Sequence, residues 1–447
     1  MDTIFALSTP PGKSGVAVIR VSGPQAATTL IAFGINTLPV PRRAVLAALR
    51  IQEDALDKAL VLYFQAPHSF TGEECVEYHV HGGRAVIKRL LEALGSLPLL
   101  RPAEAGEFTR RAFLNGKIDL TAAEGLADLI DAETEAQRKQ ALRFMQGDAA
   151  RFYGRLRAGI LEALALTEAY IDFPDEEIPA QVLEETDIKI QELDRLIEAQ
   201  LADKGATERV RDGVQVAILG PPNAGKSSLM NLLARRDVAI VSETAGTTRD
   251  VIEVHLDING YAVIVADTAG LREADDAVER EGIRRSFARA DAADIRIIVL
   301  DAEVLAHDGG RFLEEESLKN LINQDAIILF NKVDIAPPSP LPVIGGLTPI
   351  PFSARERTGM EMLMARLAEK IAAISGVEAS FIARGRHRYH LSEALVHMRR
   401  YLTLKVVGLE LRCEELRRAA VEIGKITGVV SADEVLGVVF SRFCIGK

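Results

Sequence analysis

The chain has 447 residues, of which 48% are hydrophobic, and a formal net charge of −11. This length favours about three domains over a single core, and the acidic balance disfavours a protein that coats nucleic acid nonspecifically. We expect a cytoplasmic protein without a membrane span, because no apolar run reaches roughly 18 residues, no signal peptide is visible, and the three cysteines are too scattered for a disulfide framework or a zinc cluster.

The first part of the chain mixes short strands with helices. Alternating and short apolar runs predict strands over 4–7, 15–21, 59–64 and 75–80, and a helix over 84–94. Such mixing is typical of an α+β arrangement. We therefore predict an N-terminal α+β domain over residues 1–117.

From about residue 118 the apolar period becomes helical, as in Ile190, Leu193 and Ile197. Helical periodicity returns near the end of the chain, over 389–406 and 411–426. The simplest inference is a helical domain in two parts, 118–210 and 376–447, into which an α/β domain is inserted at 211–375.

Residues 220–227, Gly-Pro-Pro-Asn-Ala-Gly-Lys-Ser, match the GxxxxGKS/T phosphate-binding loop at every fixed position. A predicted strand over 214–219 precedes the loop and a predicted helix over 228–233 follows it, which is the context that the loop requires. Glycines let the backbone wrap a phosphate, and the helix N-terminus favours its charge. We expect Lys226 to reach the β- and γ-phosphates and the Ser227 hydroxyl to ligate Mg²⁺.

The motif Asn331-Lys332-Val333-Asp334 follows the apolar strand predicted over 326–330. A carboxylate at Asp334 accepts hydrogen bonds from N1–H and the exocyclic amine of guanine, which adenine does not offer in that geometry, so the motif favours GTP over ATP. Asn331 and Lys332 are expected to brace this loop and cover the base. Ser353 and Ala354 suit a backbone contact to the guanine carbonyl.

Two loops between these motifs have the composition of nucleotide switches. Asp267, after the strand predicted over 261–266, is expected to hold Mg²⁺ through water, and the Gly270 N–H to sense the γ-phosphate. Thr248 is expected to be a second Mg²⁺ ligand. The residues predicted to contact GTP are Asn223, Ala224, Gly225, Lys226, Ser227, Ser228, Ser242, Glu243, Thr244, Ala245, Gly246, Thr247, Thr248, Asp267, Thr268, Ala269, Gly270, Asn331, Lys332, Asp334, Ser353 and Ala354.

Leu271 occupies the position after Asp-Thr-Ala-Gly, where Ras-like GTPases use a glutamine to orient the attacking water. Leucine has no polar atom for this task, so the chain either lacks turnover or uses another residue. Carboxylates follow at Asp275, Asp276, Glu279 and Glu281. The Asn223 amide oxygen either ligates a monovalent cation beside the phosphates or hydrogen-bonds its own loop.

Several segments together resemble the family of tRNA-modification GTPases MnmE, also called TrmE, over the whole chain. They are the phosphate loop with Asn223, the switch segments 245–250 and 267–271, the N-terminal segments 18–24 and 112–120, and the C-terminal Phe-Cys-Ile-Gly-Lys at 443–447. The resemblance implies a P-loop GTPase domain inserted into a helical domain, with an N-terminal α+β domain of folate-binding type.

The resemblance also implies roles for individual residues of the nucleotide site. Asn223 becomes a ligand of K⁺, and Ser242, Thr244 and Thr247 complete the cage of the ion. Glu279 matches the acidic residue that positions the attacking water through a bridge. The cage is expected to close when the G domains of two subunits meet across the nucleotides.

A second site is implied only by the resemblance. Arg20, Glu77, Lys117 and Lys447 match positions that bind 5-formyltetrahydrofolate or a related one-carbon folate, in the domain that also forms a homodimer. Arg and Lys suit the glutamate tail of a folate, and a carboxylate suits the pterin edge. Cys444 is either a nucleophile beside the one-carbon donor or a small apolar anchor of the tail.

These features lead to the expectation of a K⁺-stimulated GTP hydrolase that requires Mg²⁺. By resemblance it acts with an FAD-dependent MnmG-type partner, in a heterotetramer or larger complex, to install a 5-carboxymethylaminomethyl group on the wobble uridine of certain tRNAs. A regulatory or ribosome-assembly GTPase without modification chemistry is the alternative from another class. A nucleotide-binding scaffold without turnover is a third, suggested by Leu271.

Overall fold

The structure is a computed structural model, in which the chain forms two compact units. Unit 1 comprises Met1–Ala127, Phe144–Gln191 and Glu393–Lys447, and unit 2 comprises Asp128–Arg143 and Glu192–Ser392. The described residues are 2–172, 181–203, 205–221, 223–236, 239–240, 253–267, 293–304, 322, 325–337, 342–375, 380–404, 408–430, 433–441 and 443–446.

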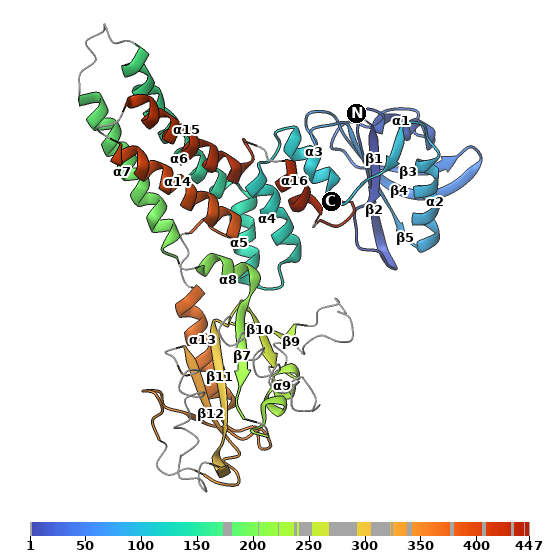
Figure 1. Cartoon of the computed structure of the whole chain (residues 1–447). Helices are drawn as coiled ribbons and strands as arrows, with labels where there is room; N and C mark the ends of the chain where they lie inside the picture. Colours follow the sequence, from blue (N-terminus) through green and yellow to red (C-terminus); the bar gives the residue numbers. More distant parts are fainter. Residues whose placement is uncertain are drawn as a thin grey trace, which may run out of the picture. The chain divides into compact units, whose positions relative to one another are not determined.

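The N-terminal part of unit 1 is built on a six-stranded sheet with the order β3-β4-β5-β2-β1-β6 among the described residues (Figure 1). Neighbouring strands are antiparallel, except that β1 and β6 are parallel. The strands are β1 (Thr3–Leu7), β2 (Ser14–Ser22), β3 (Val45–Ile51), β4 (Asp54–Phe64), β5 (Cys75–Gly82) and β6 (Leu100–Pro102).

The two faces of this sheet differ because side chains alternate along each strand. On β2, Ile19 and Val21 are buried in the core, which is covered by α1 (Ala26–Ala32) and α2 (Arg84–Gly95). Arg20 and Ser22 point to the opposite face. There α3 (Glu107–Leu114) places Phe108 against Ile4 of β1. This second face holds the N-terminal site residues.

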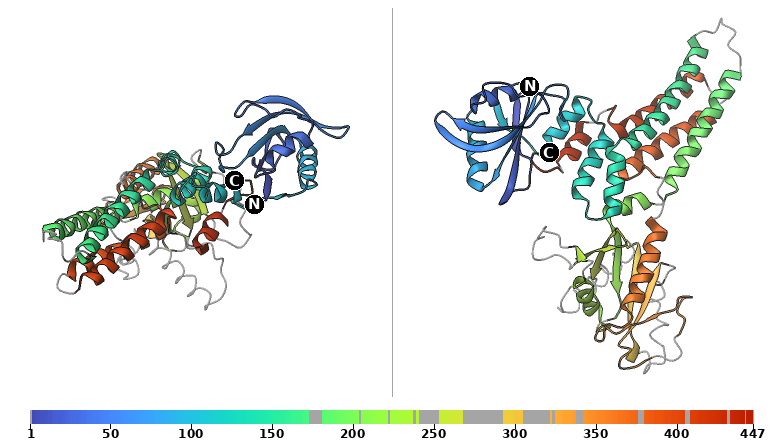
Figure 2. Two further views of the ribbon diagram at one scale, coloured as in Figure 1. Left: turned by 90° about the horizontal axis from the view of Figure 1, so that it is seen from above. Right: turned by 180° about the vertical axis from the view of Figure 1, so that it is seen from behind.

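The rest of unit 1 is helical. Long helices α6 and α15 lie side by side (Figure 2), and α15 is followed by α16, which packs against α3. The boundaries between the units fall inside α4, α5, α7 and α14. The helices are α4 (Leu120–Asp131), α5 (Glu135–Met145), α6 (Asp148–Asp172), α7 (Gln181–Leu201), α14 (Gly385–Thr403), α15 (Leu409–Thr427) and α16 (Asp433–Ser441).

Unit 2 contains a seven-stranded sheet with the order β13-β12-β11-β7-β10-β9-β8 in the described part of the chain. The strands from β13 to β10 pair in parallel, whereas β9 pairs antiparallel with both β10 and β8, so the prediction of a mostly parallel sheet is confirmed. The strands are β7 (Val214–Leu219), β8 (Ala239–Ile240), β9 (Glu253–Ile258), β10 (Tyr261–Asp267), β11 (Ile295–Asp301), β12 (Ala326–Asn331) and β13 (Ile350–Pro351).

In the part of unit 2 that the structure describes, three helices accompany this sheet: α8 (Ala206–Asp212), α9 (Lys226–Ala234) and α13 (Met360–Ser375). Leu229 and Leu233 of α9 and Leu363 and Leu367 of α13 are fully buried in the sheet's core cluster. Such i, i+4 pairs present one apolar stripe to the sheet, which explains why these segments are helical. In the described residues, no helix is both long and apolar enough to cross a membrane.

Candidate functional site

The phosphate loop connects the central strand β7 to α9, at the carboxyl end of the parallel strands. Gly220 has φ +143°, and a Cβ there would lie 2.2 Å from the Val299 carbonyl oxygen. Gly225 has φ +100°, and its Cβ would lie 2.1 Å from Asn331 Nδ2. Both positions therefore require glycine, and the loop they form is a cradle at the edge where α/β sheets bind ligands.

The expected phosphate contacts come from this loop and the first turn of α9. Lys226 Nζ donates to the carbonyl oxygens of Gly220 and Pro221, at 2.7 Å each, so the lysine lies along the inside of the loop. Ser227 and Asn223 are exposed, and Asn223 adopts the left-handed conformation with φ 61°. The glycine cradle, the lysine and the helix N-terminus together fit the phosphates of a nucleotide.

Asn331, at the end of β12, joins the phosphate loop to the loop after β13. Its Nδ2 donates to the Ala224 carbonyl at 2.7 Å, and its Oδ1 accepts from the Ala354 amide at 3.1 Å. The residue is 3% exposed, so its contact with Ala224 is shielded from water and its contact with Ala354 is partly shielded. The structure thus brings together the predicted phosphate-binding and guanine-binding segments through one residue.

The Asp334 carboxylate, which the sequence predicts to read guanine, is held by its neighbours. Ser353 Oγ donates to Asp334 Oδ1 at 2.6 Å, which fixes the orientation of the carboxylate. Lys332, in the left-handed conformation, forms an ion pair with Asp301 at the end of β11. These four side chains converge at the carboxyl ends of β11, β12 and β13, where the donors of a guanine base find acceptors.

Of the two switch segments, only Asp267 lies in the described part of the chain. Asp267 ends β10 opposite Ile218 of β7, which places its backbone beside the start of the phosphate loop. Nothing is described of its side chain. The predicted residues that lie outside the described part of the chain are Ser242, Glu243, Thr244, Ala245, Gly246, Thr247, Thr248, Thr268, Ala269, Gly270 and Glu279.

The second group of predicted residues lies in unit 1. Arg20 of β2 and Glu77 of β5 are register partners, and Arg20 Nε donates to Glu77 Oε1 at 2.9 Å. The Arg20 guanidinium also contacts the rings of Phe70 and Phe108, with centroids at 5.5 and 5.6 Å. A cation between two aromatic faces is stabilised by both rings. Neither phenylalanine is predicted as a site residue from the sequence.

Lys117 contacts the loop that contains Phe70. Its Nζ donates to the Pro67 carbonyl at 2.9 Å, and a Cβ at Gly72 would contact its methylene groups at 3.3 Å. The loop over residues 65–74, between β4 and β5, therefore touches both Arg20 and Lys117. The structure brings these two predicted residues and Glu77 around one segment.

The C-terminal tail docks on the N-terminal sheet. Ile445 forms an antiparallel bridge with Ala105, and Ser8 Oγ donates to the Gly446 carbonyl at 2.9 Å. Gly446 has φ +99°, and a Cβ there would lie 2.1 Å from the Leu7 carbonyl oxygen. This contact requires glycine at position 446; Lys447 lies outside the described residues.

The three cysteines differ in accessibility. Burial raises the pKa of Cys75 to about 12 and that of Cys413 to about 11, so both are thiols at neutral pH. Cys444 is exposed, although its backbone carbonyl accepts from the Gly106 amide. Its side chain therefore does not act as a buried apolar anchor. The preceding residue, Phe443, is buried and packs with Phe440 and Leu120.

A glycine cradle between a central parallel strand and a helix that begins with lysine, tied through Asn331 to a guanine-reading carboxylate, defines a P-loop GTPase.

Comparisons with known proteins identify the family. The family model for the MnmE helical domain matches residues 120–444, and the one for the N-terminus of the GTP-binding protein TrmE matches residues 3–117. The tRNA modification GTPases MnmE of Parvibaculum lavamentivorans and Caulobacter vibrioides are 50% and 48% identical, over 100% of this chain and of each relative. A mitochondrial protein of Danio rerio, named as subunit GTPB3 of a 5-taurinomethyluridine-tRNA synthase, is 45% identical over 100% of this chain and 93% of the relative. The chain therefore belongs to the MnmE family of tRNA modification GTPases.

Proposed function

We propose that this enzyme hydrolyses GTP to drive a step in the modification of the wobble uridine of certain tRNAs. The observation that carries the proposal is the Asn331 bridge, because it connects the phosphate cradle to the guanine-reading loop within one buried hydrogen-bonded unit. The names of the relatives supply the substrate class: two are tRNA modification GTPases, and a third belongs to a uridine-modifying synthase.

In the nucleotide site, the chain's own residues bind and orient GTP. Lys226 exchanges its carbonyl contacts for the β- and γ-phosphates, and Asp334 accepts from the guanine edge. Ser227 and Thr248 would hold Mg²⁺, with Asp267 acting through water; the ion supplies positive charge to the phosphates. Two features fit this assignment. The loop has glycine at 220 and 225, where a Cβ would clash with neighbouring atoms. The ligands proposed for Mg²⁺ are hydroxyl and carboxylate oxygens, which this ion prefers.

Hydrolysis requires a substitute for the missing glutamine. Asn223, Ser242, Thr244 and Thr247 would hold K⁺, which supplies the charge that an arginine finger supplies elsewhere. The exposure of Asn223 supports this role, because an exposed residue is accessible to an ion from solution. Glu279 is proposed to orient the attacking water through a bridge.

The N-terminal site is proposed to bind 5-formyltetrahydrofolate or a related one-carbon folate. Arg20 holds Glu77 in a fixed orientation, and Glu77 reads the pterin edge, while Lys117 and Lys447 bind the glutamate tail. The flat ring of Phe70 beside this pair suits a planar heterocycle. Cys444, exposed in the docked tail, is the candidate nucleophile toward the one-carbon unit.

The same proposal includes the organisation of the molecule. The boundaries 1–117, 118–210, 211–375 and 376–447 describe an N-terminal domain, a helical domain in two parts and the G domain between them. The protein is proposed to act in the cytoplasm as a homodimer, whose G domains meet across the nucleotides. A MnmG-type FAD protein joins it in a heterotetramer or larger complex on tRNA.

The K⁺ dependence of GTP turnover tests the proposal. We expect wild-type turnover in K⁺ to exceed that in Na⁺, at equal ionic strength, by about 100-fold, the effect typical of one preorganised electrostatic group. Asn223→Ala should remove this difference while GTP still binds. Asn231→Ala, on the exposed side of α9, is the matched control and should behave as wild type. Retention of the full K⁺ response by Asn223→Ala would refute the cation site.

A further inference from the structure

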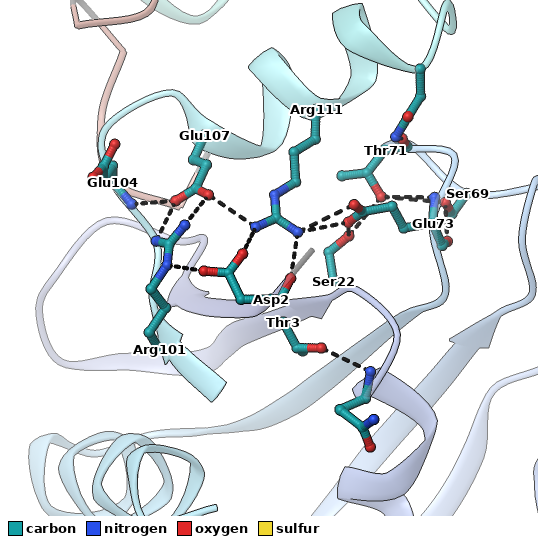
Figure 3. A network of polar contacts seen from close by, with 12 residues as sticks. Asp2, Thr3, Ser22, Ser69, Thr71, Glu73, Arg101, Glu104, Glu107 and Arg111 are labelled. Atoms are coloured by element: carbon teal, nitrogen blue, oxygen red, sulfur yellow. Dashed lines mark hydrogen bonds and ion pairs between the residues drawn. The ribbon is translucent and has the colours of Figure 1, made fainter. Parts of the chain in front are cut away.

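A connected group of charged and hydroxyl side chains joins the start of the chain, β2, α3 and the loop over 65–74 (Figure 3). Its centre is Arg111, on α3, whose side chain is only 10% exposed. Arg111 Nη1 donates to the Asp2 carbonyl oxygen at 2.9 Å and to Glu73 Oε2 at 3.1 Å, and Nη2 donates to Asp2 Oδ1 at 2.9 Å and to Glu107 Oε1 at 3.0 Å. One guanidinium therefore connects the N-terminus, α3 and the loop over 65–74.

Further hydrogen bonds hold the 65–74 loop in place. Ser22 Oγ, on β2, donates to Glu73 Oε2 at 2.7 Å and lies 2.7 Å from Thr71 Oγ1. Asn115 Nδ2, just after α3, donates to the Thr71 carbonyl at 2.7 Å. Ser22 and Thr71 are fully buried, so water does not compete for these bonds. The loop is thus held to both β2 and α3.

The two rings that contact Arg20 come from the two elements that Arg111 joins. Phe70 belongs to the loop, one residue before Thr71, and Phe108 belongs to α3, one residue after Glu107. Arg20 lies between them on β2, two residues before Ser22 and on the same face of the sheet. The contacts of Arg111 are therefore among those that set the separation of the two rings.

Stability alone does not account for so many charges in a shielded place. Removing ions from water is costly, and apolar residues of similar volume often replace a buried ion pair without loss of stability. The charged groups fix the relative positions of their elements, because the planar guanidinium fork of arginine donates only to partners in a limited set of positions. Burial acts to lower the pKa of Arg111, but Glu73 and Glu107 raise it above its ordinary value, so the fork stays charged.

We propose that Arg111 is a positioning residue for the N-terminal ligand site: it holds the 65–74 loop against α3, so that Phe70 and Phe108 clamp Arg20 and orient Glu77 toward the ligand. This inference rests on the proposed folate site for its ligand, but the clamp itself is a property of the protein alone. The two can therefore be tested separately.

The main variant is Arg111→Met in the full-length protein, which keeps the length of the side chain but removes the fork. The NMR resonance of Arg20 Nε–H, observed with isotope-labelled arginine, reports the clamp. It is assigned by its loss in Arg20→Lys. Two neighbouring ring faces shift this resonance away from the position that an exposed arginine shows. We expect Arg111→Met to move it to that position and to weaken 5-formyltetrahydrofolate binding, measured by calorimetry, by about tenfold, as for one lost charge-assisted hydrogen bond.

Arg101→Met is the matched control. Arg101 Nη1 and Nη2 donate to the same Glu107 carboxylate at 2.8 and 2.6 Å, but its other hydrogen bonds go to Asp2 and the Pro102 carbonyl and not to the 65–74 loop. It should lower the Tm as Arg111→Met does, yet leave the Arg20 resonance and the folate affinity unchanged. Glu73→Gln weakens the Arg111–Glu73 ion pair from the loop side and should reproduce the effects of Arg111→Met. It serves as the second variant if the Arg111→Met protein does not fold.

Two results would overturn the inference. If Arg111→Met and Glu73→Gln lower the Tm but keep the wild-type resonance and affinity, the network is structural only. If the resonance moves equally in Arg101→Met, the effect is a general loosening of α3. Failure of the wild type to bind the folate refutes the folate site instead, and the resonance then decides the role of Arg111 by itself.

Discussion

Single side chains that bridge distant segments carry both sites. Asn331 satisfies the carbonyl of Ala224, which is buried in the phosphate loop, and the amide of Ala354, which is half-buried in the loop after β13. Arg20 has a comparable position in unit 1, between Glu77 and two rings. In each case the residue that sets the geometry lies near the residue proposed to read the ligand, Asp334 or Glu77.

Asn331→Ala should weaken GTP binding rather than only destabilise the fold. Losing two hydrogen bonds of about 1 kcal/mol each predicts a roughly 30-fold higher Kd for GTP, measured by fluorescence titration with a labelled nucleotide. Affinity for 5-formyltetrahydrofolate should stay at its wild-type value, because that site is built within unit 1. A lower Tm with an unchanged Kd for GTP would show that Asn331 only supports the sheet.

At the scale of elements, the start of α3 is where several contacts meet. Gly106, with φ +66°, precedes the helix, and a Cβ there would lie 2.3 Å from the Phe440 carbonyl of α16. Glu107 follows and accepts from Arg101, Arg111 and the Glu104 amide. The same helical turn thus contacts the C-terminal segment on one side and the Arg111 network on the other.

The carboxylate of Glu107 makes this element sensitive to acid. Burial acts to raise its pKa, but the hydrogen bonds from Arg101, the Glu104 amide and Arg111 outweigh burial and lower the pKa below the ordinary 4.5. The contribution of Glu107 to stability is therefore fully present above that value and is lost as the pH falls toward the lowered pKa.

Chemical unfolding of wild type and Glu107→Gln from about pH 7 to about pH 3 measures this contribution. We expect the wild type to be more stable by about 1–3 kcal/mol near neutral pH, and the difference to shrink below the ordinary carboxyl pKa of 4.5. Glu356→Gln, exposed in unit 2, is the control and should show no such trend. A difference that is independent of pH would contradict the lowered pKa.

At the scale of the whole molecule, the two sites belong to different compact units. The described nucleotide-site residues lie in unit 2, and the described N-terminal site residues lie in unit 1. Each site can therefore be altered while the other serves as an internal control. The tRNA product depends on both activities in the proposed function.

Deleting the gene should remove the wobble-uridine modification from the affected tRNAs, as measured by mass spectrometry of tRNA nucleosides. Wild-type protein should restore the modified nucleoside, whereas Asn223→Ala should not, because hydrolysis is expected to drive the modification step. Unchanged nucleosides together with altered ribosome profiles would favour the ribosome-assembly alternative.

The phosphate loop, the Asn-Lys-x-Asp motif and the strands β7, β10 and β12 of the G domain were readable from the sequence, because each is specified within one short segment. Glycines, lysine and hydroxyl at fixed spacing determine how a loop wraps a phosphate, and apolar runs such as 214–219 and 326–330 predict the strands that flank it. β11 is not among the predicted strands, because a short apolar run alone does not distinguish a strand from a buried helix. β3 is missing too, because this edge strand is mostly exposed.

Only the tertiary structure decided which segments meet. Asn331 reaches a loop 107 residues away, and Ser8 binds the tail 438 residues away. The clamp of Phe70 and Phe108 on Arg20 and the fork of Arg111 depend on the register of β2 with β5 and on the meeting of a loop with a helix. Local periodicity reports which face of an element is buried, whereas the partner on that face is chosen by the packing of the whole domain.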